Sequence, residues 1–129
     1  MKRFVWALQI VLGVYFVLIG IMHFIVPEGL PEPMAWMYDL PTWAHVVAGV
    51  AEVAGGLGLV LPQLTGIRRE LVPMAAAGLT IVMLSAAVYH VGRSEYQNIV
   101  FNLVLAGLLA WVAAFRRRPE DLAGAAPAH

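Results

Sequence analysis

The chain contains four largely apolar segments of about 20 residues each, and these segments limit its fold more than any other feature. They cover about residues 4–26, 42–61, 72–92 and 98–115. A helix of 20 residues is about 30 Å long, which matches the hydrocarbon core of a bilayer. Lipid cannot satisfy backbone hydrogen-bonding groups, so each segment must be a helix. The sequence therefore predicts an all-α integral membrane protein, built as a bundle of four transmembrane helices.

Prolines and polar stretches mark the ends of the predicted helices. Pro27 ends the first segment, Pro62 ends the second, and Pro73 is tolerated in the first turn of the third. We expect residues 1–118 to form one transmembrane domain. Residues 119–129 are rich in alanine, glycine and proline, which predicts a disordered cytoplasmic tail.

The basic residues predict the orientation of the bundle. Seven of the eight Lys and Arg residues lie near the termini or between the second and third segments: Lys2, Arg3, Arg68, Arg69, Arg116, Arg117 and Arg118. Loops rich in Lys and Arg stay in the cytoplasm, so we expect both termini to be cytoplasmic. We interpret the three consecutive arginines as a topology anchor. The composition favours a multi-pass protein of a bacterial plasma (inner) membrane, surrounded by lipid.

The loop between the first two segments, PEGLPEPMAWMYDLPTW, is rich in proline, acidic residues and aromatics. Trp36, Tyr38 and Trp43 are typical of an interfacial aromatic belt, which predicts that the loop lies along the outer membrane surface. A lid over a substrate is the alternative interpretation of the same loop.

Polar side chains inside the apolar segments are predicted to gather in the outer half of the bundle. At 1.5 Å per residue, the histidines of the first three segments lie near the outer surface, and Tyr15 and Thr80 lie near mid-membrane. The inner half offers little beyond Gln9. The candidates for binding a ligand or handling protons are Glu52, His45, His23, His90, Asn102 and Tyr15.

Glu52 is the most unusual of these residues, because a carboxylate in the middle of a membrane helix costs roughly 2.5–3.5 kcal/mol to insert. Seven residues advance a helix by about 700°, so His45 and Glu52 share one face with Gly49 and Gly56. Small residues let helices approach closely, so this face is predicted to pack against protein. Glu52 is then either a neutral carboxyl that bonds a neighbour such as Tyr15 or Thr80, or a site for a ligand or a proton.

Other kinds of site receive little support from the residues. The chain has no cysteine, which excludes disulfides, cysteine-ligated iron–sulfur clusters and covalently attached haem. His23, His45 and His90 are a weak metal-ligand set, because no two of them have a tight spacing such as i, i+4. A haem held by two histidines is no better supported. The zero net charge gives no indication of nucleic-acid binding.

Three stretches, GVAEVAGGLGLVLPQLTGI, LVPMAAAGLTIVMLSAAVYHVGRSE and NIVFN, resemble the DoxX-like family of small four-helix bacterial membrane proteins. The resemblance covers about residues 13–118. Its most specific elements are Gly49-x-x-Glu52-x-x-Gly55-Gly56, Leu64-Thr65-Gly66-Ile67, and His90-x-x-Arg93-x-Glu95 leading to Asn102. Many relatives have a lysine where this chain has His23, so a permanent positive charge is replaced by an imidazole that can be neutral.

The resemblance implies a role in quinone-linked redox chemistry. The family is named after a subunit of a terminal quinol oxidase, and related proteins belong to thiosulfate:quinone oxidoreductases. We therefore expect a quinone- or redox-associated membrane subunit that works with a protein partner or a second copy of itself. The alternative is a non-enzymatic scaffold or assembly factor, in which Arg93, Glu95, Gly49, Gly55 and Gly56 are structural pins. Whether the chain is itself an enzyme stays open.

Overall fold

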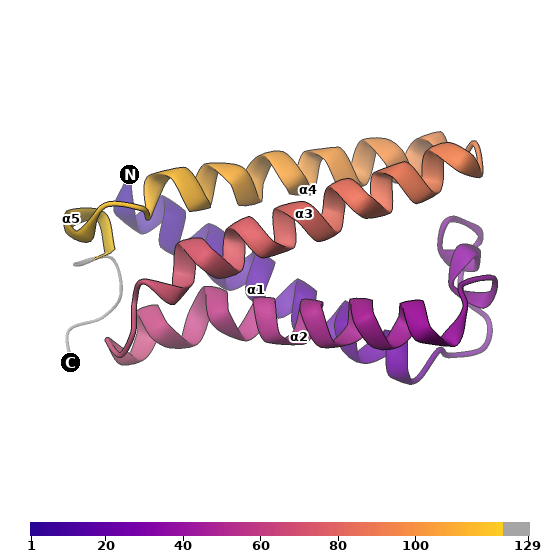
Figure 1. Ribbon diagram of the computed structural model, residues 1–129, viewed down its shortest axis with the longest axis horizontal. Coiled ribbons are helices and arrows are strands. Elements are labelled where there is room, and N and C mark those ends of the chain that lie inside the picture. The colour runs from indigo at the N-terminus through magenta and orange to yellow at the C-terminus, as the bar shows by residue number, and fades with distance from the viewer. Residues whose placement is uncertain (123–129) are drawn as a thin grey trace.

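The computed structural model describes residues 1–122, which form helices and no strand (Figure 1). The elements are α1 (Lys2–Phe24), the short 3-10 helix η1 (Glu32–Tyr38), α2 (Thr42–Thr65), α3 (Leu71–Gly92), α4 (Tyr96–Phe115) and α5 (Pro119–Leu122). Helices α1 to α4 are each long and apolar enough to span a membrane. The predicted all-α fold with four membrane-spanning helices is confirmed, while the side on which the termini lie remains a prediction.

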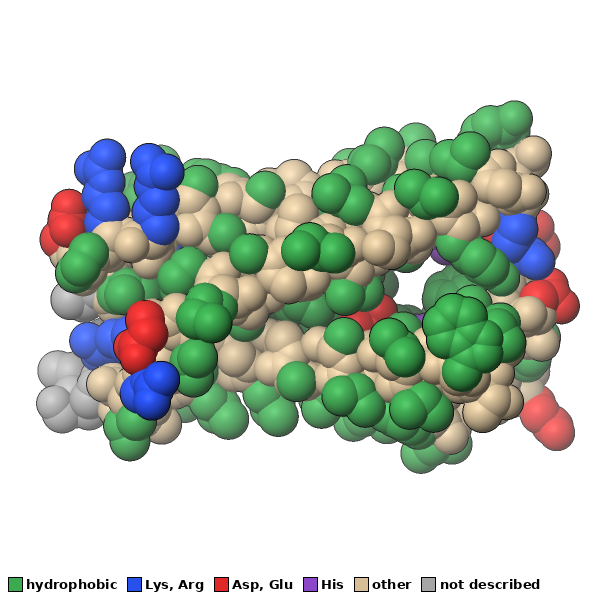
Figure 2. Space-filling view, viewed as in Figure 1, with side chains coloured by type: hydrophobic (Ala, Val, Ile, Leu, Met, Phe, Trp, Pro, Cys, Tyr) green, Lys and Arg blue, Asp and Glu red, His purple; other side chains and the backbone are tan. Residues whose placement is uncertain are grey.

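The bundle consists of neighbouring helices packed in sequence order, α1 on α2, α2 on α3 and α3 on α4. The N-terminus, the α2–α3 loop and α5 lie together at one end, here called the terminal end (Figure 1). Helix η1 and the α3–α4 turn lie at the opposite end, here called the η1 end. Apolar side chains cover the sides of the bundle, and charged side chains gather at its ends (Figure 2). This distribution is the one expected of a protein whose sides face lipid.

Glycines bring the backbones of α1 and α2 into direct contact. Gly13 and Gly20 on α1, and Gly49 and Gly56 on α2, each lie seven residues apart and therefore on one side of their helix. A Cβ atom on Gly56 would lie 2.7 Å from the carbonyl oxygen of Gly13. A Cβ atom on Gly49 would lie 2.5 Å from the ring of Phe24. This close crossing holds the polar residues of α1 beside those of α2.

Helix α2 is longer than the sequence predicts. The expected end at residue 61 is wrong, because Pro62 lies inside the helix, which continues to Thr65. A proline removes only one backbone N–H, whereas Gly66 adopts the left-handed conformation (φ 75°) that caps a helix. The amide of Gly66 donates a hydrogen bond to the carbonyl of Pro62 over 3.0 Å.

The other helix ends shift by smaller amounts. Helix α1 ends at Phe24, before the predicted residue 26, because the residue preceding Pro27 is restricted to extended conformations. Helix α4 begins at Tyr96, before the predicted residue 98, and its first turn is closed by the bond from the amide of Ile99 to the carbonyl of Glu95.

The terminal end contains a buried polar network around Arg116. The Arg116 side chain is fully buried, and its Nε donates to Oε1 of Gln9 over 2.7 Å. Its other nitrogens donate to the backbone carbonyls of Asp121 and Lys2. Arg116 is therefore not a solvated surface residue, and the interpretation of the three arginines as a topology anchor stays a prediction.

The first residues of the predicted tail are ordered by the same network. Residues 119–122, which the sequence assigns to a disordered tail, form α5 instead. The side-chain amide of Gln63 donates to the carbonyl of Leu122, which ties α5 to α2. The rest of that predicted tail, residues 123–129, lies outside the residues that the structure describes.

Candidate functional site

A cavity of about 350 Å³ lies near the η1 end, between α1, α3 and α4. Every long helix contributes a polar side chain to its wall. Those side chains belong to Tyr15 and His23 on α1, Glu52 on α2, His90 on α3 and Asn102 on α4. The remaining wall is largely apolar and aromatic. The structure thus brings five of the six candidate residues to one cavity.

A second cavity of about 330 Å³ lies on the other side of the same residues, between α2 and α3. His23, Trp36, Glu52, Ala86 and His90 line both cavities. Figure 2 shows the opening between α2 and α3, with an acidic side chain at its edge, and Glu52 is the acidic residue of this lining. Glu52 therefore borders both cavities.

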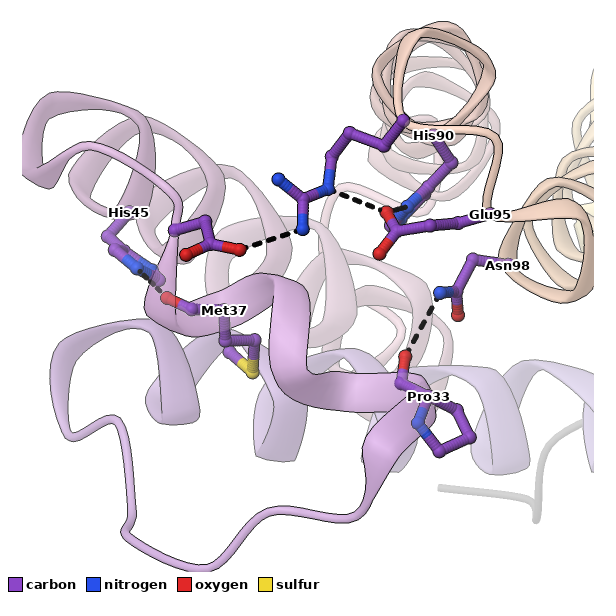
Figure 3. Close-up of polar contacts among 8 residues, drawn as sticks. Pro33, Met37, His45, His90, Glu95 and Asn98 are labelled. Carbon is purple, nitrogen blue, oxygen red and sulfur yellow. Dashed lines mark hydrogen bonds and ion pairs between the residues drawn. The ribbon is translucent and has the colours of Figure 1, made fainter.

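His45, the sixth candidate, lies outside the cavity wall and contacts it through His23. The Nδ1 atoms of His23 and His45 are 2.9 Å apart, which is a hydrogen-bond distance. Nε2 of His45 lies 2.9 Å from the carbonyl oxygen of Met37 in η1, as Figure 3 shows. Nε2 of His23 lies 3.4 Å from Oε2 of Glu52. These contacts form a line from the cavity to η1.

Glu52 lacks the interhelical hydrogen bond that one interpretation of the sequence assigns to it. The Glu52 side chain is only 5% exposed, and its Oε2 has no hydrogen-bond partner within residues 1–122. Thr80 donates to the carbonyl of Ala76 on its own helix over 2.7 Å, so its hydroxyl is used elsewhere. The ring of Tyr15 packs against Phe101 of α4.

His90 is held by an ionic cluster at the α3–α4 turn. Its Nδ1 lies 2.9 Å from Oε1 of Glu95, and Arg93 donates to the same oxygen over 2.8 Å. Arg93 also pairs with Asp39 over 2.8 Å (Figure 3). Partial burial raises the pKa of the Glu95 carboxyl, but the bonds from Arg93 and His90 outweigh burial and hold that pKa below its usual value. Glu95 is therefore ionised, Nδ1 of His90 donates to it, and Nε2 is left for the cavity.

Helix η1 folds inward over the cavity instead of lying along the membrane surface throughout. The Trp36 ring packs against the imidazole of His90 with 5.1 Å between centroids, so its assignment to an interfacial belt is wrong. Met37 is buried, and the amide of Asn98 donates to the carbonyl of Pro33 over 3.0 Å (Figure 3). Trp43, by contrast, is 70% exposed, as a belt residue would be.

The model of the DoxX-like family matches residues 7–113. The chain belongs to the DoxX-like family. No curated protein and no solved structure matches it. The matched range contains every residue that lines the two cavities of this DoxX-like chain, and it ends before Arg116.

Three residues at or beside the cavities of this DoxX-like chain are not evident from the sequence. The residues around Trp36 have the composition of a surface loop. Such a sequence does not indicate whether the loop folds inward or outward. The backbone carbonyl of Met37 carries no sequence signal at all. Ala86 matters only because its small side chain borders both cavities.

The described part of this DoxX-like chain offers no metal site. No group of three or more His, Cys, Asp or Glu side chains within residues 1–122 can hold a metal ion. His23 and His45 instead bond to each other. What the cavity offers is a set of hydrogen-bonding groups within an apolar wall.

Proposed function

We propose that this DoxX-like membrane protein binds the headgroup of a membrane quinone in its cavity and serves as a quinone-associated subunit of a redox complex. The observation that carries the proposal is Oε2 of Glu52, which is buried and lies 3.4 Å from Nε2 of His23 but has no hydrogen-bond partner within residues 1–122. A buried polar atom without a hydrogen bond costs about 1–3 kcal/mol, so this oxygen favours an occupant that can bond it.

The cavity suits both redox forms of such a headgroup. Its volume lies within the range of about 300–1,000 Å³ that is usual for small-molecule sites. Nε2 of His90 accepts hydrogen bonds, as does the Glu52 carboxyl when it has given up its proton, and the two hydroxyls of a quinol require such acceptors. The amide of Asn102 donates hydrogen bonds, as does His23 when it carries a second proton, and the two carbonyls of a quinone require such donors.

The position of the cavities suits a ligand with a long apolar tail. The second cavity opens between α2 and α3, which are long enough to span the membrane, so a tail can extend from it into lipid. A quinone exchanges electrons as well as protons, so we propose a partner protein that carries the redox centre.

The charges at the two ends support an orientation with both termini in the cytoplasm. The terminal end carries Lys2, Arg3, Arg68, Arg69 and the three arginines after α4, whereas the η1 end carries Arg93. Under the positive-inside rule the cavity lies in the extracytoplasmic half of a bacterial inner membrane.

The proposal predicts that Glu52→Gln loses bound quinone. Quinones extracted from the detergent-purified protein are measured by mass spectrometry, beside Glu70→Gln as the matched control, since Glu70 is exposed at the terminal end. We expect the wild type and Glu70→Gln to retain quinone and Glu52→Gln to retain at least tenfold less, which corresponds to about 1.4 kcal/mol of binding.

A thermal unfolding curve shows whether each variant is folded. Equal quinone in folded Glu52→Gln would place the ligand elsewhere. An absence of quinone from the wild type would overturn the proposal and favour the non-enzymatic scaffold or assembly factor.

A second prediction concerns the space that the two cavities share. Ala86→Phe places a ring where both cavities meet, so we expect the variant to fold and to retain at least tenfold less quinone than the wild type. Val88→Phe is the control. Two residues advance a helix by about 200°, so Val88 lies on the side of α3 opposite to Ala86, where it is 72% exposed. Unchanged quinone in Ala86→Phe would show that the ligand does not occupy the shared space.

A further inference from the structure

The geometry points to a proton relay: we propose that Glu52, His23 and His45 carry one proton between the cavity and the water at the η1 end. The inference deepens the proposed function, on which its purpose rests, but the relay itself requires no particular ligand. It follows from the three contacts that join Glu52 to Met37.

The carbonyl of Met37 sets the direction of every bond in this line. A carbonyl oxygen only accepts, so Nε2 of His45 carries a hydrogen. A neutral His45 then has its lone pair at Nδ1, so Nδ1 of His23 donates to it. A neutral His23 in turn presents the lone pair of Nε2 to Oε2 of Glu52. The uncharged state of the line therefore has its mobile proton on Glu52.

Two coordinated proton transfers move the charge along this line. The O–H bond of Glu52 breaks as an N–H bond forms at Nε2 of His23. The N–H bond at Nδ1 of His23 breaks as another forms at Nδ1 of His45. The products are a Glu52 carboxylate, a neutral His23 and a His45 imidazolium, with no change in the number of protons or electrons. His45 then breaks its Nε2–H hydrogen bond to the Met37 carbonyl and releases that proton to water, and the reverse steps recharge Glu52.

The residues of the line become more exposed from the cavity toward the η1 end, as a relay to water requires. Glu52 and His23 are each 5% exposed, whereas His45 is only partly buried and lies beneath η1. The bond between the two histidines already has a transfer distance, 2.9 Å. The 3.4 Å between Glu52 and His23 exceeds a normal hydrogen bond, so the carboxyl must move by about half an ångström to transfer its proton.

Other ionisable groups face the line without joining it. They are Tyr15 on α1, Tyr89 and His90 on α3, and Asp39, Arg93 and Glu95 at the η1 end. Helix α4 presents the uncharged side chains of Gln97, Asn98 and Asn102. Trp36 contacts the rings of both His23 and His90, and no hydrogen bond joins these two histidines in the described part of the chain. His90 therefore belongs to a separate branch that ends on Glu95.

The test follows the Glu52 proton directly by infrared spectroscopy of the full chain in nanodiscs, after quinone has been removed. The carbonyl stretching band of protonated Glu52 is identified by its loss in Glu52→Gln, and its shift after transfer to D2O gives the rate of proton exchange. We expect His45→Gln to slow this exchange at least tenfold, because an amide can bond His23 and Met37 but cannot pass a proton. Glu28→Gln is the control and should keep the wild-type rate, because Glu28 is an exposed ionisable residue at the η1 end that lies outside the line and both cavities.

Each result decides the relay without reference to the ligand. Equal rates in the wild type and His45→Gln would overturn it, as would equal slowing by Glu28→Gln or a wild type without a Glu52 band. His23→Gln provides a second interruption of the line and should also slow exchange if His45→Gln fails to fold. If His45→Gln slows the exchange and the wild type never retains quinone, the relay stands and the quinone proposal alone is refuted.

Discussion

Replacing Arg116 by glutamine will lower the free energy of unfolding by about 2–4 kcal/mol, whereas the same change at Arg117 will alter it by less than about 0.5 kcal/mol. Both substitutions remove one positive charge from the terminal end, so any effect on membrane topology is the same for the two. Arg116 is fully buried and Arg117 is exposed.

The expected loss arises from the acceptors that Arg116 leaves behind. Oε1 of Gln9 and the carbonyls of Asp121 and Lys2 all accept from this guanidinium. Each buried acceptor left unpaired costs about 1–3 kcal/mol, and a shorter glutamine side chain reaches at most one of them. Burial also lowers the pKa of the Arg116 guanidinium, which shows that the network holds the charge against the preference of its surroundings.

Unfolding by a graded mixture of detergents, followed by circular dichroism, measures both variants. Equal stability of Arg116→Gln and Arg117→Gln would mean that the buried network contributes nothing. Arg116→Met combined with Gln9→Leu provides a further check, since removal of both partners should restore part of the loss.

Replacing Gly56 by alanine will destabilise the bundle by about 1–3 kcal/mol, whereas Gly107→Ala will stabilise it by up to about 1 kcal/mol. The two substitutions add the same methyl group to a membrane helix. At Gly56 this group would lie 2.7 Å from the carbonyl oxygen of Gly13 and 3.0 Å from the amide nitrogen of Val17, so the helices must separate. At Gly107 no described atom lies within 4 Å, and alanine only favours the helix.

The same unfolding measurement compares the two glycine variants. Because the expected changes in the free energy of unfolding have opposite signs, a general effect of alanine on helix stability cannot account for both. A destabilisation of equal size at both positions would show that the close crossing of α1 and α2 does not matter. Because that crossing places His23 beside Glu52, folded Gly56→Ala should also lose part of its quinone.

The fold follows from the sequence because each membrane span must satisfy its own backbone, so four apolar segments leave one class of structure. The shared face of His45 and Glu52 follows from their seven-residue phase, and the gathering of polar residues in one half of the bundle follows from depth along the helix, whereas the contact of His23 with Glu52 was not predicted. Both depend only on regular helix geometry, which the chain keeps over α1 and α2.

The missed features depend on which way a single side chain turns, and periodicity does not report this. Three arginines in a row are typical of a membrane boundary, and nothing in the run shows that the first one points inward to Gln9. Trp36 likewise has the neighbours of a surface residue, and its contact with His90 arises from the path of η1. Pro62 does not end α2, because the capping residue Gly66, four residues later, determines where the helix ends.

The second cavity opens through the side of the bundle, and this has a consequence for the affinity that the site needs. A molecule that enters between α2 and α3 comes from the bilayer, where an apolar compound is concentrated in a layer only about 30 Å thick. Its local concentration there far exceeds its average over the cell volume, as with any ligand confined near its site. A site of modest intrinsic strength would therefore be filled, and a water-soluble headgroup analogue without a tail should compete poorly for it.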